Sequence, residues 1–219
     1  MKKQLLLSIV LMVLDGFVQA QILEVNPAFP TVNDVVTITY DATQGNAALV
    51  GQNQIYAHAG LITSTSTSPT NWQFVQGNWG TVDPEVTMTN IGNNKHTITI
   101  DIDQYYGFPA GTNVLKFAFV FRNAAGTIVG RSADGSDIYY DIYPVNAGLL
   151  AQFFHPNAGA ILDVNEQLQV EAAANQNASL TLKQDGIVLQ TIANATQLTY
   201  TLTATQAGTH LLEFIADNG

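Results

Sequence analysis

Apolar and polar residues alternate with a period of two in short runs along most of the sequence. In residues 34–40 (DVVTITY), for example, Val36 and Ile38 alternate with threonines. This alternation is typical of a half-buried β-strand, because successive side chains of a strand point to opposite faces. Outside residues 1–20, no segment longer than one helical turn carries the i, i+3, i+4, i+7 apolar stripe of an amphipathic helix. The sequence therefore predicts an all-β protein.

Turn-forming residues separate the alternating runs. The further runs are residues 54–58, 95–102, 114–121, 138–143, 168–173, 179–184, 187–192, 199–202 and 210–216. Asp185-Gly186 lies between two of them, and this pair is typical of a type I′ hairpin turn. Many short strands with regularly spaced turns favour immunoglobulin-like β-sandwiches.

A change of composition near Pro144 predicts two tandem sandwich domains. Residues 21–144 hold both tryptophans and nearly all the large aromatic residues, whereas residues 145–219 are richer in Ala, Gln, Leu and Thr. The second domain shows about six strands, fewer than the seven or so of an immunoglobulin-like sandwich. We therefore expect the second domain to be truncated.

Residues 1–20 have the pattern of a cleaved signal peptide. Lys2 and Lys3 precede the apolar residues 5–14, and Val18-Gln19-Ala20 is a small-residue cleavage pattern. The apolar stretch is too short to span a bilayer, which needs about 20 residues. We expect a secreted or cell-surface protein with no membrane insertion after cleavage.

The charge and the absence of cysteine exclude several function classes. The chain has 7 basic and 17 acidic residues, a net charge of −10 and no cysteine. Nucleic acid is not expected as a partner, because binding phosphates needs clustered Lys and Arg. Without cysteine there are no disulfides, thiol nucleophiles or cysteine zinc ligands.

No arrangement of residues predicts catalysis within this chain. Asp101 and Asp103 lie two apart in a predicted strand, where a solvent-facing role is the interpretation we favour over an acid and base pair. The histidines lack metal-ligand spacing, and there is no Gly-x-Ser-x-Gly nucleophile elbow. We expect no catalytic residues, no metal ligands and no cofactor. Residues 134–137 (DGSD) could offer oxygen ligands to Ca²⁺, although a turn explains them better.

The most informative residues are aromatic. Tyr56 and His58 lie two apart on a predicted strand, and Trp72 and Trp79 fall in a stretch rich in Gly and Asn. Exposed indole and phenol rings stack on the apolar faces of sugars, while Asn, Gln and His orient the hydroxyls. The alternative, which the sequence leaves open, is that one tryptophan fills the core and the other covers a loop.

The order of these motifs resembles that of the starch-binding modules of carbohydrate-binding families 25 and 26. The motifs that carry the resemblance are Tyr56-Ala57-His58-Ala59-Gly60, Trp72, Gly77-Asn78-Trp79-Gly80, Met88, residues 97–100, residues 117–123 and residues 135–139. Residues 22–144 look most like the N-terminal module of secreted α-amylase-type glycoside hydrolases of Bacteroidetes. The second domain is similar only to generic bacterial immunoglobulin-like domains.

The resemblance implies a non-catalytic module that binds an α-1,4-glucan and anchors a downstream catalytic domain on starch. By position, it assigns glucan contacts to His58 and Trp72, and also to Tyr56 and Trp79. One feature departs from these families, whose second tryptophan follows the Phe-Val-Phe strand. Residues 126–137 contain no aromatic here, and Arg131 would have to stack or hydrogen-bond in its place. The alternative is a structural spacer or adhesin-type surface protein without glycan binding.

Overall fold

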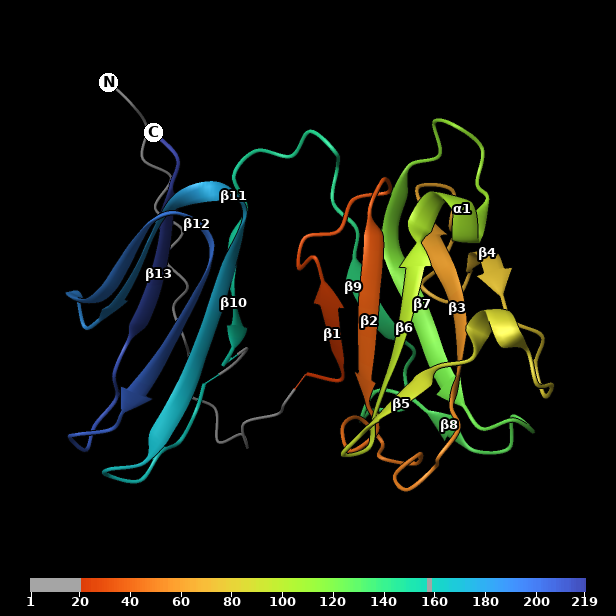
Figure 1. The fold of residues 1–219 in the computed structure, drawn as a ribbon, viewed down its shortest axis with the longest axis horizontal. Helices are drawn as coiled ribbons and strands as arrows, with labels where there is room; N and C mark the ends of the chain where they lie inside the picture. The colour runs from red at the N-terminus through yellow and green to blue at the C-terminus, as the bar shows by residue number, and fades with distance from the viewer. Residues whose placement is uncertain (1–20, 157–158) are drawn as a thin grey trace. The chain divides into compact units, whose positions relative to one another are not determined.

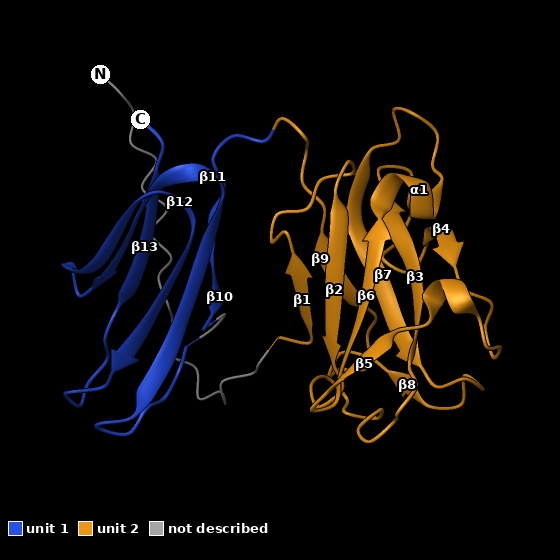
Figure 2. Ribbon diagram, viewed as in Figure 1, with its two compact units in different colours: residues 1–20, 147–219 blue, residues 21–146 orange. Residues whose placement is uncertain are grey.

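The computed structural model describes residues 21–156 and 159–219, and Figure 1 shows their strands and helices. The described residues divide into two compact units, residues 21–146 and residues 147–219 (Figure 2). The predicted signal peptide, residues 1–20, lies outside the described residues. Among the residues that are described, no helix has the length and apolar character needed to cross a membrane. The predicted all-β fold is confirmed.

One sheet of the first unit contains four antiparallel strands in the order β1-β2-β6-β5. The strands are β1 (Leu23–Asn26), β2 (Val35–Asp41), β6 (Lys95–Asp101) and β5 (Thr89–Gly92). The alternation predicted for β2 is present, since Val36, Ile38 and Tyr40 are completely buried. This face of the sheet forms one side of the core.

The second sheet of this unit has the order β4-β3-β7-β8, with β9 also paired to β7. The strands are β3 (Tyr56–Thr63), β4 (Gln73–Gln76), β7 (Val114–Arg122), β8 (Val129–Gly130) and β9 (Ile138–Asp141). Figure 1 shows the two sheets face to face. Ala57, Ala59 and Leu61 of β3 belong to the core between them. The alternate β3 residues therefore point to the outer face of the second sheet.

Two short helices interrupt the strands, namely η1 (Pro84–Val86) and α1 (Ile102–Tyr106). The prediction that Asp101 and Asp103 share a strand is wrong, because β6 ends at Asp101 and Asp103 lies in α1. Asp101 is the N-cap of α1, where its side chain accepts a hydrogen bond from the backbone N–H of Gln104. A capping carboxylate satisfies a helix N–H that would otherwise lack a partner, and this is the role we assign to Asp101.

The second unit forms one four-stranded antiparallel sheet, with β11 paired to β10, β12 and β13. The strands are β10 (Ala151–His155), β11 (Gln167–Gln184), β12 (Ile187–Thr203) and β13 (Leu212–Asp217). The six runs expected from the sequence become four strands, because two of them join in β11 and two in β12, and the register shifts between these strands end neither of them. The predicted type I′ turn is confirmed, since φ is 51° at Asp185 and 80° at Gly186.

The first core contains a completely buried histidine, His96 of β6, which lies opposite Tyr40 of β2. Burial lowers the pKa of His96, because the charged imidazolium loses water, and the backbone of Gln52 opposes only part of this effect. An unfolded chain therefore takes up a proton at this residue more readily than the folded one. The neutral side chain of His96 therefore contributes to the stability of the fold above the pKa that histidine has in the unfolded chain, about 6.5, and this contribution is lost as the pH falls.

We predict that the free energy of unfolding of the first unit falls as the pH decreases from about 7.5 to about 5.5. The His96→Leu variant should show a weaker pH dependence, whatever its absolute stability. The measurement is urea denaturation followed by tryptophan fluorescence, which reports this unit because both tryptophans lie in it. The pH dependence of stability should not vanish in His96→Leu, since burial also lowers the pKa of His58.

His210 in the second unit is the control, because its pKa shifts the other way. A hydrogen bond of 2.7 Å to Asp185 raises the pKa of His210. Its contribution to stability is present below the unfolded pKa and is lost as the pH rises through the folded pKa. His210→Gln should leave the acid sensitivity of the first unit unchanged. An unaltered pH slope in His96→Leu would contradict the prediction.

Candidate functional site

Three of the four predicted contact residues meet on the outer face of the second sheet. His58 lies on β3, Trp72 directly precedes β4, and Trp79 lies in the loop between β4 and η1. The ring of His58 is 5.9 Å from that of Trp72 and 5.3 Å from that of Trp79, measured between centroids. We call His58, Trp72 and Trp79 the aromatic cluster.

The members of the aromatic cluster differ in exposure. Trp79 is 47% exposed, whereas His58 and Trp72 are partly buried. Tyr56 is only 4% exposed, so it has no free ring face for a sugar, and the structure does not support it as a contact residue. Its ring lies beneath the guanidinium of Arg122 instead, at 5.0 Å. Trp79 is therefore the ring most open to a ligand.

Gly60 makes room for Trp72 on the sheet. A Cβ atom at residue 60 would lie 3.1 Å from both Cβ and Cε3 of Trp72. Gly60 follows His58 on the same face of β3, because side chains alternate along a strand. The absent side chain allows the indole to lie close to the strand, beside His58.

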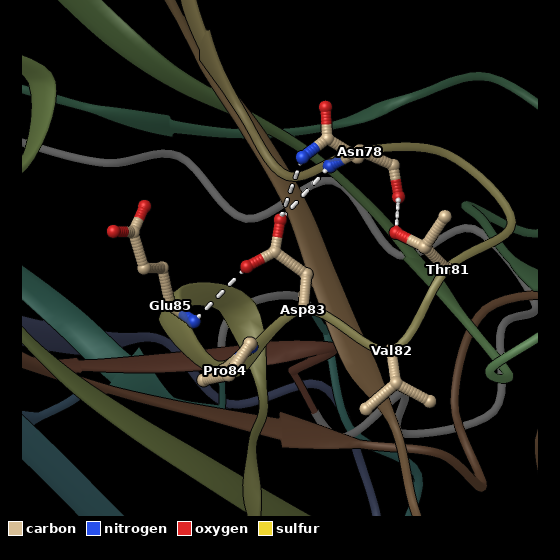
Figure 3. A pocket seen from close by; sticks show the side chains of 6 residues that line it. All are labelled: Asn78, Thr81, Val82, Asp83, Pro84 and Glu85. Carbon is tan, nitrogen blue, oxygen red and sulfur yellow. Dashed lines mark hydrogen bonds between the residues drawn. The ribbon is translucent and has the colours of Figure 1, made fainter.

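Asp83 organises the loop that carries Trp79. One carboxylate oxygen accepts hydrogen bonds from the backbone and side-chain nitrogens of Asn78, at 3.1 and 3.3 Å, and the other accepts from the backbone N–H of Glu85 at 3.1 Å. Thr81 donates a further bond to the carbonyl of Asn78 (Figure 3). The hollow in Figure 3, of about 420 Å³, lies among these residues. Since the loop itself uses both oxygens of Asp83, we interpret this carboxylate as part of the scaffold.

Arg122, the last residue of β7, is completely buried and lies beside Trp79. Its Nη2 donates to the carbonyls of Asn78 and Thr81, and its Nη1 donates to those of Asn123 and Ala124, all at 2.8–3.1 Å. Its guanidinium lies 5.8 Å from the centre of the Trp79 ring, within the range of a cation–π contact. Arg122 thereby fixes the Trp79 loop to the end of β7.

The turn after β7 also supports Trp79. A Cβ at Gly126 would lie 2.6 Å from Nε1 of Trp79, so only glycine allows the indole this position. Gly126 is also the first residue of the segment 126–137. The resemblance to starch-binding modules would place a second tryptophan in this segment, which contains no aromatic residue. Arg131 does not replace it, because its guanidinium forms an ion pair with Asp137. The structure thus places Trp79 itself against this turn.

His58 is held in its neutral form near pH 7. Burial lowers the pKa of its imidazole most, and the positive charge of Arg122 lowers it further. The backbone of Gly77 and the negative charge of Asp137 act in the opposite direction. A neutral imidazole has one donor and one acceptor nitrogen, which suits pairing with a hydroxyl group.

The segment considered for calcium forms a turn. The carboxylate of Asp134 accepts hydrogen bonds from both the backbone N–H and the hydroxyl of Ser136, and Asp137 is paired with Arg131. Within residues 21–156 and 159–219, no three His, Cys, Asp or Glu side chains gather as metal ligands would.

The supporting roles of Arg122, Gly60 and Gly126 were not predicted from the sequence, although Arg122 and Gly60 lie in motifs that carry the resemblance. Arg122 could have been noticed, because it ends the apolar run FAFVF as a lone charged residue. Nothing local distinguishes Gly60 or Gly126 from the other glycines, because their importance comes from tryptophans that approach from elsewhere in the chain.

Part of the chain matches a known family model. Residues 23–129 match the model of a family described as a domain of unknown function, DUF8578. No curated protein matches the chain. The matched segment includes the aromatic cluster, Arg122 and Gly126, but not residues 147–219.

We predict that Arg122→Lys destabilises the first unit by about 3 kcal/mol, because a lysine cannot bridge the carbonyls that the guanidinium joins. Tryptophan emission of the folded variant should also shift to longer wavelength as Trp79 leaves its support. Urea denaturation and fluorescence measure the two effects. Arg131→Lys, at a more exposed ion pair, is the matched control and should change stability by less than about 1 kcal/mol.

Proposed function

We propose that the first unit is a non-catalytic α-glucan-binding module of an extracellular glycoside hydrolase. The observation that carries the proposal is the half-exposed ring of Trp79 beside His58 and Trp72 on the outer face of a sheet. The resemblance to starch-binding modules supports the same ligand. Such a module holds an enzyme on its polysaccharide and raises the local substrate concentration.

The aromatic cluster has the groups that sugar binding requires. The exposed face of Trp79 can stack on the C–H face of a glucose ring, and such contacts between flat surfaces bury much apolar area. His58 offers a neutral imidazole to a sugar hydroxyl. Arg122, Asp83 and Gly126 hold the Trp79 loop in place before the ligand arrives, which lowers the entropic cost of binding.

The chemistry of the cluster favours binding over hydrolysis. Glycoside hydrolysis uses two carboxyl groups on opposite sides of the scissile bond. The acidic residue that acts on His58 is Asp137, whose carboxylate is already paired with Arg131. Asp83 is likewise committed to its own loop.

The second candidate is a structural spacer. It is favoured by the way Trp79 is supported, since Arg122 and Gly126 give this ring a packing role that needs no ligand. The two functions differ in one respect. A spacer has no use for the exposed face of Trp79, whereas a glucan-binding module depends on it.

We predict that the wild-type protein is retarded in a native gel containing amylose and that Trp79→Ala is not, because the substitution removes the stacking surface. Val82→Ala, on the same loop and 71% exposed, is the matched control and should be retarded like the wild type. Circular dichroism should show that both variants are folded. A wild-type protein that runs at the same relative mobility with and without amylose would refute the α-glucan proposal and leave the spacer.

A further inference from the structure

A second hollow, of about 520 Å³, lies on the same sheet as the aromatic cluster. It is lined by Ile62 and Thr63 at the end of β3, by loop residues between 64 and 69, by Leu115 and Lys116 of β7, and by Tyr139 of β9. This volume falls within the range of pockets that hold small molecules. None of these residues belongs to the site described above.

The hollow continues the face that carries the cluster. His58, Gly60 and Ile62 follow each other on the outer side of β3, since alternate side chains of a strand share a face. Ile62 lies four positions after His58, about 13 Å further along the strand at the usual rise. Lys116 lies opposite Ile62, and Tyr139 lies opposite Ala118, the partner of Gly60. A ligand that extends along β3 from His58 would reach the hollow.

Tyr139 connects the hollow to the cluster. Its hydroxyl donates a hydrogen bond of 3.0 Å to the carbonyl of Pro69 and so attaches the loop before Trp72 to β9. Trp72 also lies close enough to the phenol to act on its pKa, which it lowers against the larger effect of burial. Tyr139 and Pro69, which both line the hollow, therefore also help to hold the loop that leads to Trp72.

The lining of the hollow suits a neutral, hydroxylated ligand with an apolar face. Ile62, Leu115, Pro69 and the ring of Tyr139 offer apolar surface, and Leu115 is 41% exposed. Serine and threonine residues 63, 64, 66, 67 and 68 supply the polar part of the lining. Lys116, the charged residue of the lining, is paired with Asp141 at 2.5 Å, so the hollow offers no unpaired charge to an ionic ligand. An apolar surface beside hydroxyl groups is the pattern that a sugar ring requires.

We propose that this hollow is a second subsite for the same α-glucan. The glucan chain lies along β3, from Trp79 at the aromatic cluster to Lys116 in the hollow. The inference rests on the proposed function, because it extends that site. It specifies the ligand as a chain long enough to cover both places. Short oligosaccharides bind at the aromatic cluster alone.

The test is isothermal titration of linear α-1,4-glucan oligosaccharides of increasing length against three proteins. For the wild type, we expect the affinity to rise about tenfold once the chain spans both subsites, which corresponds to about 1.4 kcal/mol. Leu115→Asp places a charge in the hollow and should lose this increase while keeping the affinity for short chains. Val35→Asp, on the other sheet and 57% exposed, is the matched control and should retain both.

The outcomes separate this inference from the proposed function. If short chains bind and longer chains bind no better, or if Leu115→Asp keeps the increase, the second subsite is refuted while the α-glucan module stands. If no chain binds the wild type, the proposed function fails and the subsite with it. Amide chemical shifts of residues 62–68 give a test without substitution, since only long chains should perturb them. Equal shifts with short chains would also overturn the inference.

Discussion

The candidate site depends on the buried guanidinium of Arg122. A charged group is costly to bury unless hydrogen bonds and neighbouring groups compensate it. Here four backbone carbonyls accept its protons, the ring of Tyr56 lies on it, and the carboxylate of Asp83 acts on it electrostatically. Two of those carbonyls belong to the loop of Trp79, so the position of this exposed ring is fixed by a completely buried group.

Small residues on the sheet complete the arrangement. Gly60 and Gly126 each leave the space that an indole occupies, and any side chain there would displace it. A tryptophan in a loop ordinarily samples several orientations, and fixing it on binding costs conformational entropy. Gly60, Gly126 and Arg122 restrict the indoles already in the folded protein, so this entropy is lost on folding and not on binding. An indole held in this way is well suited to bind a flat ligand. The residues that hold it also stabilise the fold.

The two units reach the same fold class through different means. The first unit buries a broad core between two sheets, including aromatic residues of β7. The second buries a smaller core on one sheet whose longest strands, β11 and β12, pair along most of their length. Four of the runs predicted from the sequence join to form β11 and β12, two in each strand. Bulges shift the register and the alternation locally, so the sequence pattern breaks although each strand continues.

The sequence by itself determined the all-β class, most strand positions and the Asp185-Gly186 turn, because these follow from side-chain alternation and local backbone preference. It also pointed to His58, Trp72 and Trp79. Only the tertiary structure decided that Tyr56 is buried and that Arg122 supports Trp79. These outcomes depend on contacts between residues far apart in the chain, such as Arg122 with Asn78 and Gly126 with Trp79. No local pattern encodes such contacts, because they form only when the two sheets and their loops pack together.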